Sequence, residues 1–124
     1  MNNLMIIHRN AEINQPIYQI DRDGGALPIA HTGSYRCTLR KRKGDDAPVL
    51  TFQTGGGSGV GTLSVIYDEV DDEVRDLFLL EAEQALAAVL DPGAYYGDIV
   101  RTDGTDDQPI GEFEAIVDPR NPNP

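Results

Sequence analysis

The clearest pattern in the chain is an alternation of apolar and polar residues over residues 92–117. Two alternating segments are joined by an Asp- and Gly-rich turn and are entered through a Pro-Gly corner. The inward-facing set is Tyr95, Gly97, Ile99, Phe113, Ala115 and Val117, and the outward-facing set is Tyr96, Asp98, Val100, Glu112 and Glu114. A period of two is typical of a half-buried antiparallel hairpin. The pattern therefore predicts two paired strands here.

Three further segments have the composition of short strands between turns. Residues 17–20 end at the Asp- and Gly-rich stretch 21–25, which is a strong turn signal. Residues 34–42 alternate, and after a turn at Gly44 a short strand returns at 49–53. The last two segments predict a second hairpin-like unit.

Residues 55–61 are the segment richest in glycine. A glycine-rich phosphate loop opens a helix and ends in Gly-Lys-Ser/Thr. Here the segment leads instead into an apparent strand at residues 62–67. We therefore interpret it as a mobile loop between two strands.

Residues 73–90 allow two interpretations. Their apolar positions have helical spacing, which is consistent with one long helix. Alternatively, residues 73–80 form a strand, and only residues 81–90, which are strong helix formers, form a short helix. Asp91-Pro92-Gly93 ends the segment in either case.

At 124 residues the chain predicts one domain. We place this domain at residues 17–118. Residues 1–16 are expected to be an N-terminal arm or an irregular edge, and the proline-rich residues 119–124 an extended tail. No apolar run is long enough to span a membrane or to act as a signal peptide, so we expect a protein made and used without export.

Thirteen glycines and eight prolines indicate many turns, which suits short strands. The net charge of −11 argues against nucleic-acid binding, because phosphates would be repelled. Cys37 is the only cysteine, so the fold does not depend on an internal disulfide. It alternates with Tyr35 and Leu39, which predicts a small buried apolar residue rather than a nucleophile.

Half of the basic residues are concentrated in one short stretch. It contains Arg36, Arg40, Lys41, Arg42 and Lys43. The simpler interpretation is the solvated face and tip of a strand. The alternative is a contact patch for an acidic partner, such as the acidic face of a neighbouring copy.

The residues that could serve in catalysis or metal binding do not have the spacing of known catalytic or metal-binding motifs. His8 and His31 lie apart, without metal-ligand spacing, and Ser58 lacks the strand-turn-helix context of a nucleophile. The acidic run 68–73 lacks the pattern of a calcium loop, so we interpret it as a solvated turn and leave calcium binding open. We expect no enzymatic activity, no cofactor and no deep pocket of convergent polar groups.

Three short motifs resemble a family of small β-sandwich modules in the virions of tailed bacteriophages. The family includes the N-terminal domain of the baseplate upper protein and related fibre, neck and head-spike attachment domains. The motifs here are Thr32-Gly33 followed by Arg40, then Gly93-Ala94-Tyr95-Tyr96-Gly97-Asp98-Ile99 and Gly111-Glu112-Phe113-Glu114-Ala115-Ile116-Val117. The family has an aromatic residue where this chain has Gly97, so we expect Tyr96 or Tyr18 to fill that space.

The resemblance implies an all-β fold, an immunoglobulin-like antiparallel sandwich with one short helix at about residues 81–90. It favours the strand at 73–80 over the long helix. It also implies a non-enzymatic virion subunit of a neck, tail adaptor, baseplate or capsid decoration, assembled in the host cytoplasm. Its partners would be portal, capsid, tail or fibre subunits and copies of itself, with contacts through Tyr96, the basic residues, edge strands and terminal arms. The alternative is a carbohydrate- or receptor-binding sandwich, which would need exposed aromatics such as Tyr96 or Tyr67.

Overall fold

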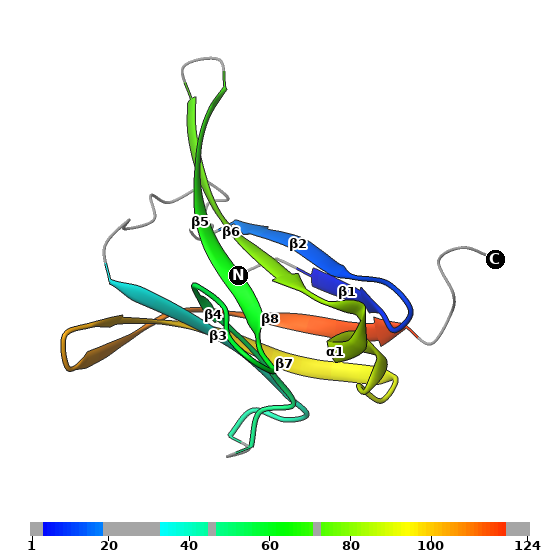
Figure 1. The fold of residues 1–124 in the computed structure, drawn as a ribbon. Helices are drawn as coiled ribbons and strands as arrows, with labels where there is room; N and C mark the ends of the chain where they lie inside the picture. Colours follow the sequence, from blue (N-terminus) through cyan, green and yellow to red (C-terminus); the bar gives the residue numbers. More distant parts are fainter. Residues whose placement is uncertain (1–3, 19–32, 45–46, 71–72, 119–124) are drawn as a thin grey trace.

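The computed structural model describes residues 4–18, 33–44, 47–70 and 73–118 (Figure 1). Within these ranges the chain forms eight strands and one short helix. They are β1 (Leu4–His8), β2 (Ile13–Tyr18), β3 (Ser34–Arg40), β4 (Leu50–Thr54), β5 (Gly61–Val70), β6 (Glu73–Ala82), α1 (Gln84–Ala88), β7 (Gly93–Asp103) and β8 (Asp106–Asp118).

The strands form one mixed sheet with the order β1-β8-β7-β3-β4-β5-β6-β2. The pairs β1/β8 and β4/β5 are parallel, and the other neighbours are antiparallel. The predicted all-β class is thus confirmed. The strands belong to one continuous sheet, and the immunoglobulin-like arrangement stays a prediction.

The sheet is bent, so that it encloses its own core. In Figure 1, β5 and β6 cross over β7 and β8, and the two ends of the strand order, β1 and β2, lie side by side. The rings of Tyr35 on β3 and Phe78 on β6 meet edge to face, with centroids 5.0 Å apart. Because β4 and β5 separate these strands in the sheet, this contact crosses the core and joins its two halves.

The predicted C-terminal hairpin is confirmed as β7 and β8. Tyr95, Gly97 and Ile99 are buried, and so are Phe113, Ala115 and Val117. The outward Glu112 and Glu114 are exposed. A shift of register between Ile99 and Val100 marks a bulge, which adds local twist to the longest pair of strands.

Two buried glycines lie directly opposite phenylalanines on neighbouring strands. Gly97 pairs with Phe113, and Gly61 pairs with Phe52. A Cβ built on Gly97 would lie 2.5 Å from Cζ of Phe113, and one on Gly61 would lie 2.4 Å from Cδ1 of Phe52. Each ring therefore occupies the space that a side chain on the facing glycine would take.

The pair of Gly97 and Phe113 corrects one expectation. The space at Gly97 was expected to be filled by Tyr96 or Tyr18. It is filled by Phe113, because directly opposed residues on antiparallel strands point to the same face. Tyr96 lies on the other face of β7 and is half-buried.

The glycine-rich segment connects two parallel neighbours, β4 and β5, with residues 55–60 alone. A parallel pair usually needs a connection of about a dozen or more residues. Here the backbone N–H of Gly56 donates to the carbonyl of Gln53 at 3.0 Å, and the chain turns twice. Left-handed backbone is taken by Gly55 (φ 81°), Gly56 (φ 69°) and Gly59 (φ 74°). The predicted place between two strands is confirmed, and the loop has a defined double turn.

For residues 1–16 the sequence allowed an N-terminal arm or an irregular edge, and over the residues that the structure describes the arm is wrong, because they form edges of the sheet. Residues 4–16 contribute to β1 and β2, the two edge strands. The side chains of Met5, Ile7 and Ile13 are buried in the core. The turn between these strands is also fixed, since Arg9 donates to the carbonyl of Ala88 at 2.9 Å.

Three further predictions concern the segment 73–90, the pair of strands around Gly44, and the segments 21–25 and 119–124. Residues 73–82 form β6 and residues 84–88 form α1, so the strand with a short helix is confirmed over the single long helix. The unit of β3 and β4 is an antiparallel pair, as expected. The expected turn at 21–25 and the tail 119–124 lie outside the described residues.

We expect Gly97→Ala to destabilise the fold by about 1–3 kcal/mol, because the added methyl group overlaps the Phe113 ring. The free energy of unfolding in urea measures this loss. In a Phe113→Leu background the same substitution should cost clearly less, since the ring is gone. An equal cost in both backgrounds would show that the ring is not the obstacle.

Cys37 should resist thiol reagents in the native protein. It is fully buried, and burial, followed by the nearby charge of Asp98, holds its pKa well above the usual range. Only the thiolate reacts readily. We expect labelling by a maleimide to require unfolding and to accelerate with urea in step with the loss of structure. Rapid labelling without denaturant would contradict this burial.

Candidate functional site

Five of the six residues predicted as assembly contacts gather at one end of the outer sheet face. Arg40 ends β3 and pairs in register with Tyr96 on β7. Lys41, Arg42 and Lys43 follow in the exposed turn after β3, and we call these three residues the basic turn. The sixth residue, Arg36, lies further along β3, is exposed and pairs in register with Val100. Five of the six residues thus lie together, and their role as assembly contacts stays a prediction.

Arg40 is tied into the sheet instead of standing free. Its Nη1 donates to the hydroxyl of Thr38 and lies 3.4 Å from the carboxylate of Asp98. Thr38, which is buried, donates to the same carboxylate. The network joins β3 to β7 on the outer face, so Arg40 stabilises the sheet as well as contributing charge.

A second polar cluster surrounds the Tyr96 ring. The Nζ of Lys43 lies 5.8 Å from the ring centroid and 3.2 Å from the carboxylate of Glu112. Burial, and then the hydrogen bond to Glu112, raise the pKa of Tyr96. The hydrogen bond from Tyr96, followed by that from Lys43, lowers the pKa of Glu112. The ring, cation and carboxylate therefore form one linked group beside a shallow groove.

Lys41 and Arg42 are held less firmly. Lys41 approaches the carboxylate of Asp91 at 3.5 Å, but both side chains are more than half exposed. Such exposed pairs contribute little to stability. Arg42 is exposed and makes no ion pair within the described part of the chain. The basic turn thus presents cations that a partner can still bind.

An apolar pair lies on the same outer face. Ile6 on β1 and Ile116 on β8 are direct neighbours in register, and they are 49% and 37% exposed. They form a small apolar patch on the solvent-facing side of the sheet. The sequence did not identify this pair, because Ile6 was assigned to an arm.

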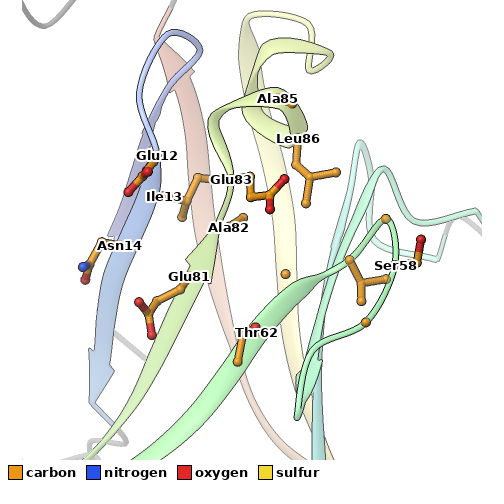
Figure 2. A pocket seen from close by; sticks show the side chains of 14 residues that line it. Glu12, Ile13, Asn14, Ser58, Thr62, Glu81, Ala82, Glu83, Ala85 and Leu86 are labelled. Carbon is orange, nitrogen blue, oxygen red and sulfur yellow. The ribbon is translucent and has the colours of Figure 1, made fainter.

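A hollow of about 550 Å³ lies elsewhere, between β2, the double turn, β6 and α1 (Figure 2). Its lining includes Glu12, Glu81 and Glu83 and the apolar Ile13 and Leu86. In Figure 2 the side chain of Glu83 points toward Leu86, whereas those of Glu12 and Glu81 point away from it. We call it the acidic hollow. The sequence predicts no deep pocket of convergent polar groups. The structure has a hollow of this size with three carboxylates in its lining, which differs from that prediction. The carboxylates are exposed. Glu81 and Glu83 are two positions apart in the chain, whereas Glu12 comes from a distant turn, and the sequence gave no signal that it would lie near them.

In the ranges that the structure describes, no three or more His, Cys, Asp or Glu side chains are grouped so that they could hold a metal ion. The side chains of the acidic run 68–73 lie outside that description, and calcium binding there stays open. None of the described helices is long and apolar enough to cross a membrane. No protein-family model matches the chain, and no curated protein matches its sequence.

The linked group at Tyr96 predicts a titration. Because its pKa is lowered on folding, Glu112 contributes stability above its unfolded pKa, and this contribution is lost as the pH falls through the folded value. We expect carboxyl NMR to find Glu112 titrating below its usual range, and Tyr96→Phe to shift it upward more than Lys43→Gln does.

Arg42→Gln serves as the control for this titration. It removes a cation from the same turn that makes no ion pair with Glu112 in the described structure. If Arg42→Gln moved the Glu112 titration as far as Tyr96→Phe does, general charge rather than the hydrogen bond would be responsible.

Proposed function

We propose that this protein is a non-enzymatic structural subunit of a tailed-phage virion. The neck, the tail adaptor, the baseplate and a capsid decoration are the positions that the sequence resemblance suggests. Its partners would be portal, capsid, tail or fibre subunits together with copies of itself. The proposal is supported by that resemblance and by the contacts between the strands that contain the resembling motifs.

One observation carries the proposal. The motifs that resemble the phage modules fall on β3, β7 and β8, which are consecutive in the sheet order. The arginine that ends the first motif, Arg40, contacts the aspartate of the second, Asp98, at 3.4 Å. Gly97 departs from the second motif, since the family has an aromatic residue there, and Phe113 of the third motif fills the space. Residues recognised separately in the sequence thus contact one another, which supports a shared structural unit.

The outer surface suits assembly. Among the described strands, β1 and β2 each pair with a neighbour on one side alone, and edge strands of this kind can pair with another chain. The exposed pair Ile6 and Ile116 lies beside the edge strand β1. Symmetric assemblies of small subunits are built from such edges and faces. The expected terminal arms are reduced to residues 1–3 and 119–124, which lie outside the description.

The alternative of a carbohydrate- or receptor-binding module has less support. It needs an aromatic ring with a free face for stacking. The Tyr96 ring is half-buried, and the Nζ of Lys43 lies over the ring. The Tyr96 hydroxyl is hydrogen-bonded to Glu112. The side chain of Tyr67 lies outside the description. We therefore favour the assembly role.

The proposal is tested on phage particles from the strain that encodes the chain. We expect density-purified particles to contain it in a fixed ratio to the major capsid protein, measured by quantitative mass spectrometry. Particles made after deletion of the gene should be incomplete by electron microscopy, and the plasmid-borne gene should restore them. A chain that is expressed during particle production but absent from purified particles would refute the proposal.

A further inference from the structure

The basic turn lies just outside the paired part of the sheet. Strand β3 ends at Arg40, and its last partner in β4 is met in the pair of Leu39 with Leu50. The three basic residues, 41–43, and the following Gly44 are all exposed. The space around Gly44 is open, since a Cβ built on it meets no atom within 4 Å. Three consecutive peptide bonds that follow a lysine or an arginine are therefore presented to solvent (Figure 1).

The other arginines that the structure describes are held more firmly. Arg9 donates to the carbonyl of Ala88. The rest belong to strands, namely Arg36, Arg40, Arg75 and Arg101. A protease needs access to the backbone of its substrate, so a peptide bond within a strand is cleaved only while that strand is open. An exposed turn can be cleaved without such opening.

A protease of basic specificity fits this turn chemically. Such an enzyme carries a carboxylate in the pocket that receives the residue before the cleaved bond, and the carboxylate pairs with lysine or arginine. Water is the co-reactant. For the bond between Arg42 and Lys43, hydrolysis breaks the C–N bond, leaves a carboxylate on Arg42 and leaves the nitrogen, with the proton it gains, as the new amino group of Lys43.

The turn also divides the strands into two sets that alternate in the sheet. Strands β1, β2 and β3 precede it, and β4 to β8 follow it with α1. In the strand order β1 lies beside β8, β2 lies beside β6, and β3 lies between β7 and β4. Among the described strands, each strand of the first set therefore pairs with members of the second set alone. A cut in the turn breaks none of these pairings.

Strand β3 joins two parts of the second set. It pairs with β7 over Ser34–Arg40 and with β4 over Arg36–Leu39. Without β3 the described ladders leave β7 and β8 as one group and β4, β5 and β6 as another. The inward side chains of Cys37 and Leu39 on β3 are fully buried. Each piece therefore needs the other to complete the core, which favours their association after a cut.

We infer that the basic turn is a cleavage site for a protease that cuts after lysine or arginine, and that the cleaved chain keeps its fold as a complex of two fragments. The inference concerns the free chain, in which no partner covers the turn. It goes beyond the proposed function and does not rest on it.

Limited digestion with trypsin tests the position of the cut. Arg22 and Arg120 lie outside the described residues, so every chain carries Arg22→Gln and Arg120→Gln. We expect mass spectrometry of the native digest to find the first cut after Lys41, Arg42 or Lys43. A variant that also carries Lys41→Gln, Arg42→Gln and Lys43→Gln should be cut about tenfold or more slowly, because the remaining described arginines require local opening.

Arg36→Gln is the matched control for the digestion. Arg36 is exposed like the basic turn, but it lies within β3, where it pairs with Gln53 and Val100. Its loss should leave the rate of the first cut unchanged. Urea unfolding of each uncut variant checks that the fold is kept.

The state of the cut chain is tested on the digest without separating the fragments. We expect the two fragments to elute together in native size-exclusion chromatography, and Cys37 to stay protected from a maleimide as in the intact chain. The midpoint of urea unfolding should rise with protein concentration after the cut, because unfolding now separates two molecules. The midpoint of the intact chain should not depend on concentration.

The inference is overturned if the variant without the three basic residues is cut as fast as its parent, or if Arg36→Gln slows the first cut as much as the triple substitution does. It is also overturned if the fragments separate without denaturant or if Cys37 reacts at once after the cut. None of these results depends on the composition of phage particles. The chain's absence from particles would refute the proposed function and leave this inference standing.

Discussion

The fold depends on one constraint, which is that a single sheet must bend far enough to enclose its own core. A one-layer sheet leaves its apolar face open to water, and the helix α1 is too short to cover it. Two facing pairs lie in this core, Gly97 with Phe113 and Gly61 with Phe52. In each pair the ring occupies the space that a side chain on the glycine would take, so the volume is filled without overlap. The contact of Tyr35 with Phe78 then joins the two halves across the core.

The sequence was sufficient where the structure follows from local alternation. In β7 and β8 each inward residue is two positions from the next, so the pattern identifies the strands and the buried face without knowledge of the partner. The burial of Cys37 followed from the same rule. The short helix could be placed because residues 84–88 are good helix formers next to a Pro-Gly stop.

The sequence was insufficient where pairing is long-range. Leu4 to Ile7 is a continuous apolar run without alternation, and the pairing of Met5 with Ala115 joins opposite ends of the chain. No local signal predicts a parallel partner so far away. Similarly, glycine content shows that residues 55–61 can turn, but not that they turn twice to bring β5 parallel to β4. The three carboxylates of the acidic hollow were missed for the same reason, since only the folded sheet brings Glu12 close to Glu83.

The resemblance and the acidic hollow lie in different halves of the sheet. The motifs occupy β3, β7 and β8, whereas the hollow is built from β2, β5, β6 and α1, with the double turn. The half that carries the motifs contains the Arg40–Asp98 contact and the inward Phe113, which are features of internal stability. The other half contains Glu12, Glu81 and Glu83, which are exposed and make no ion pair within the described residues. The motif residues Arg40, Asp98 and Phe113 are therefore paired or buried within the sheet, whereas the unpaired carboxylates lie outside the motifs.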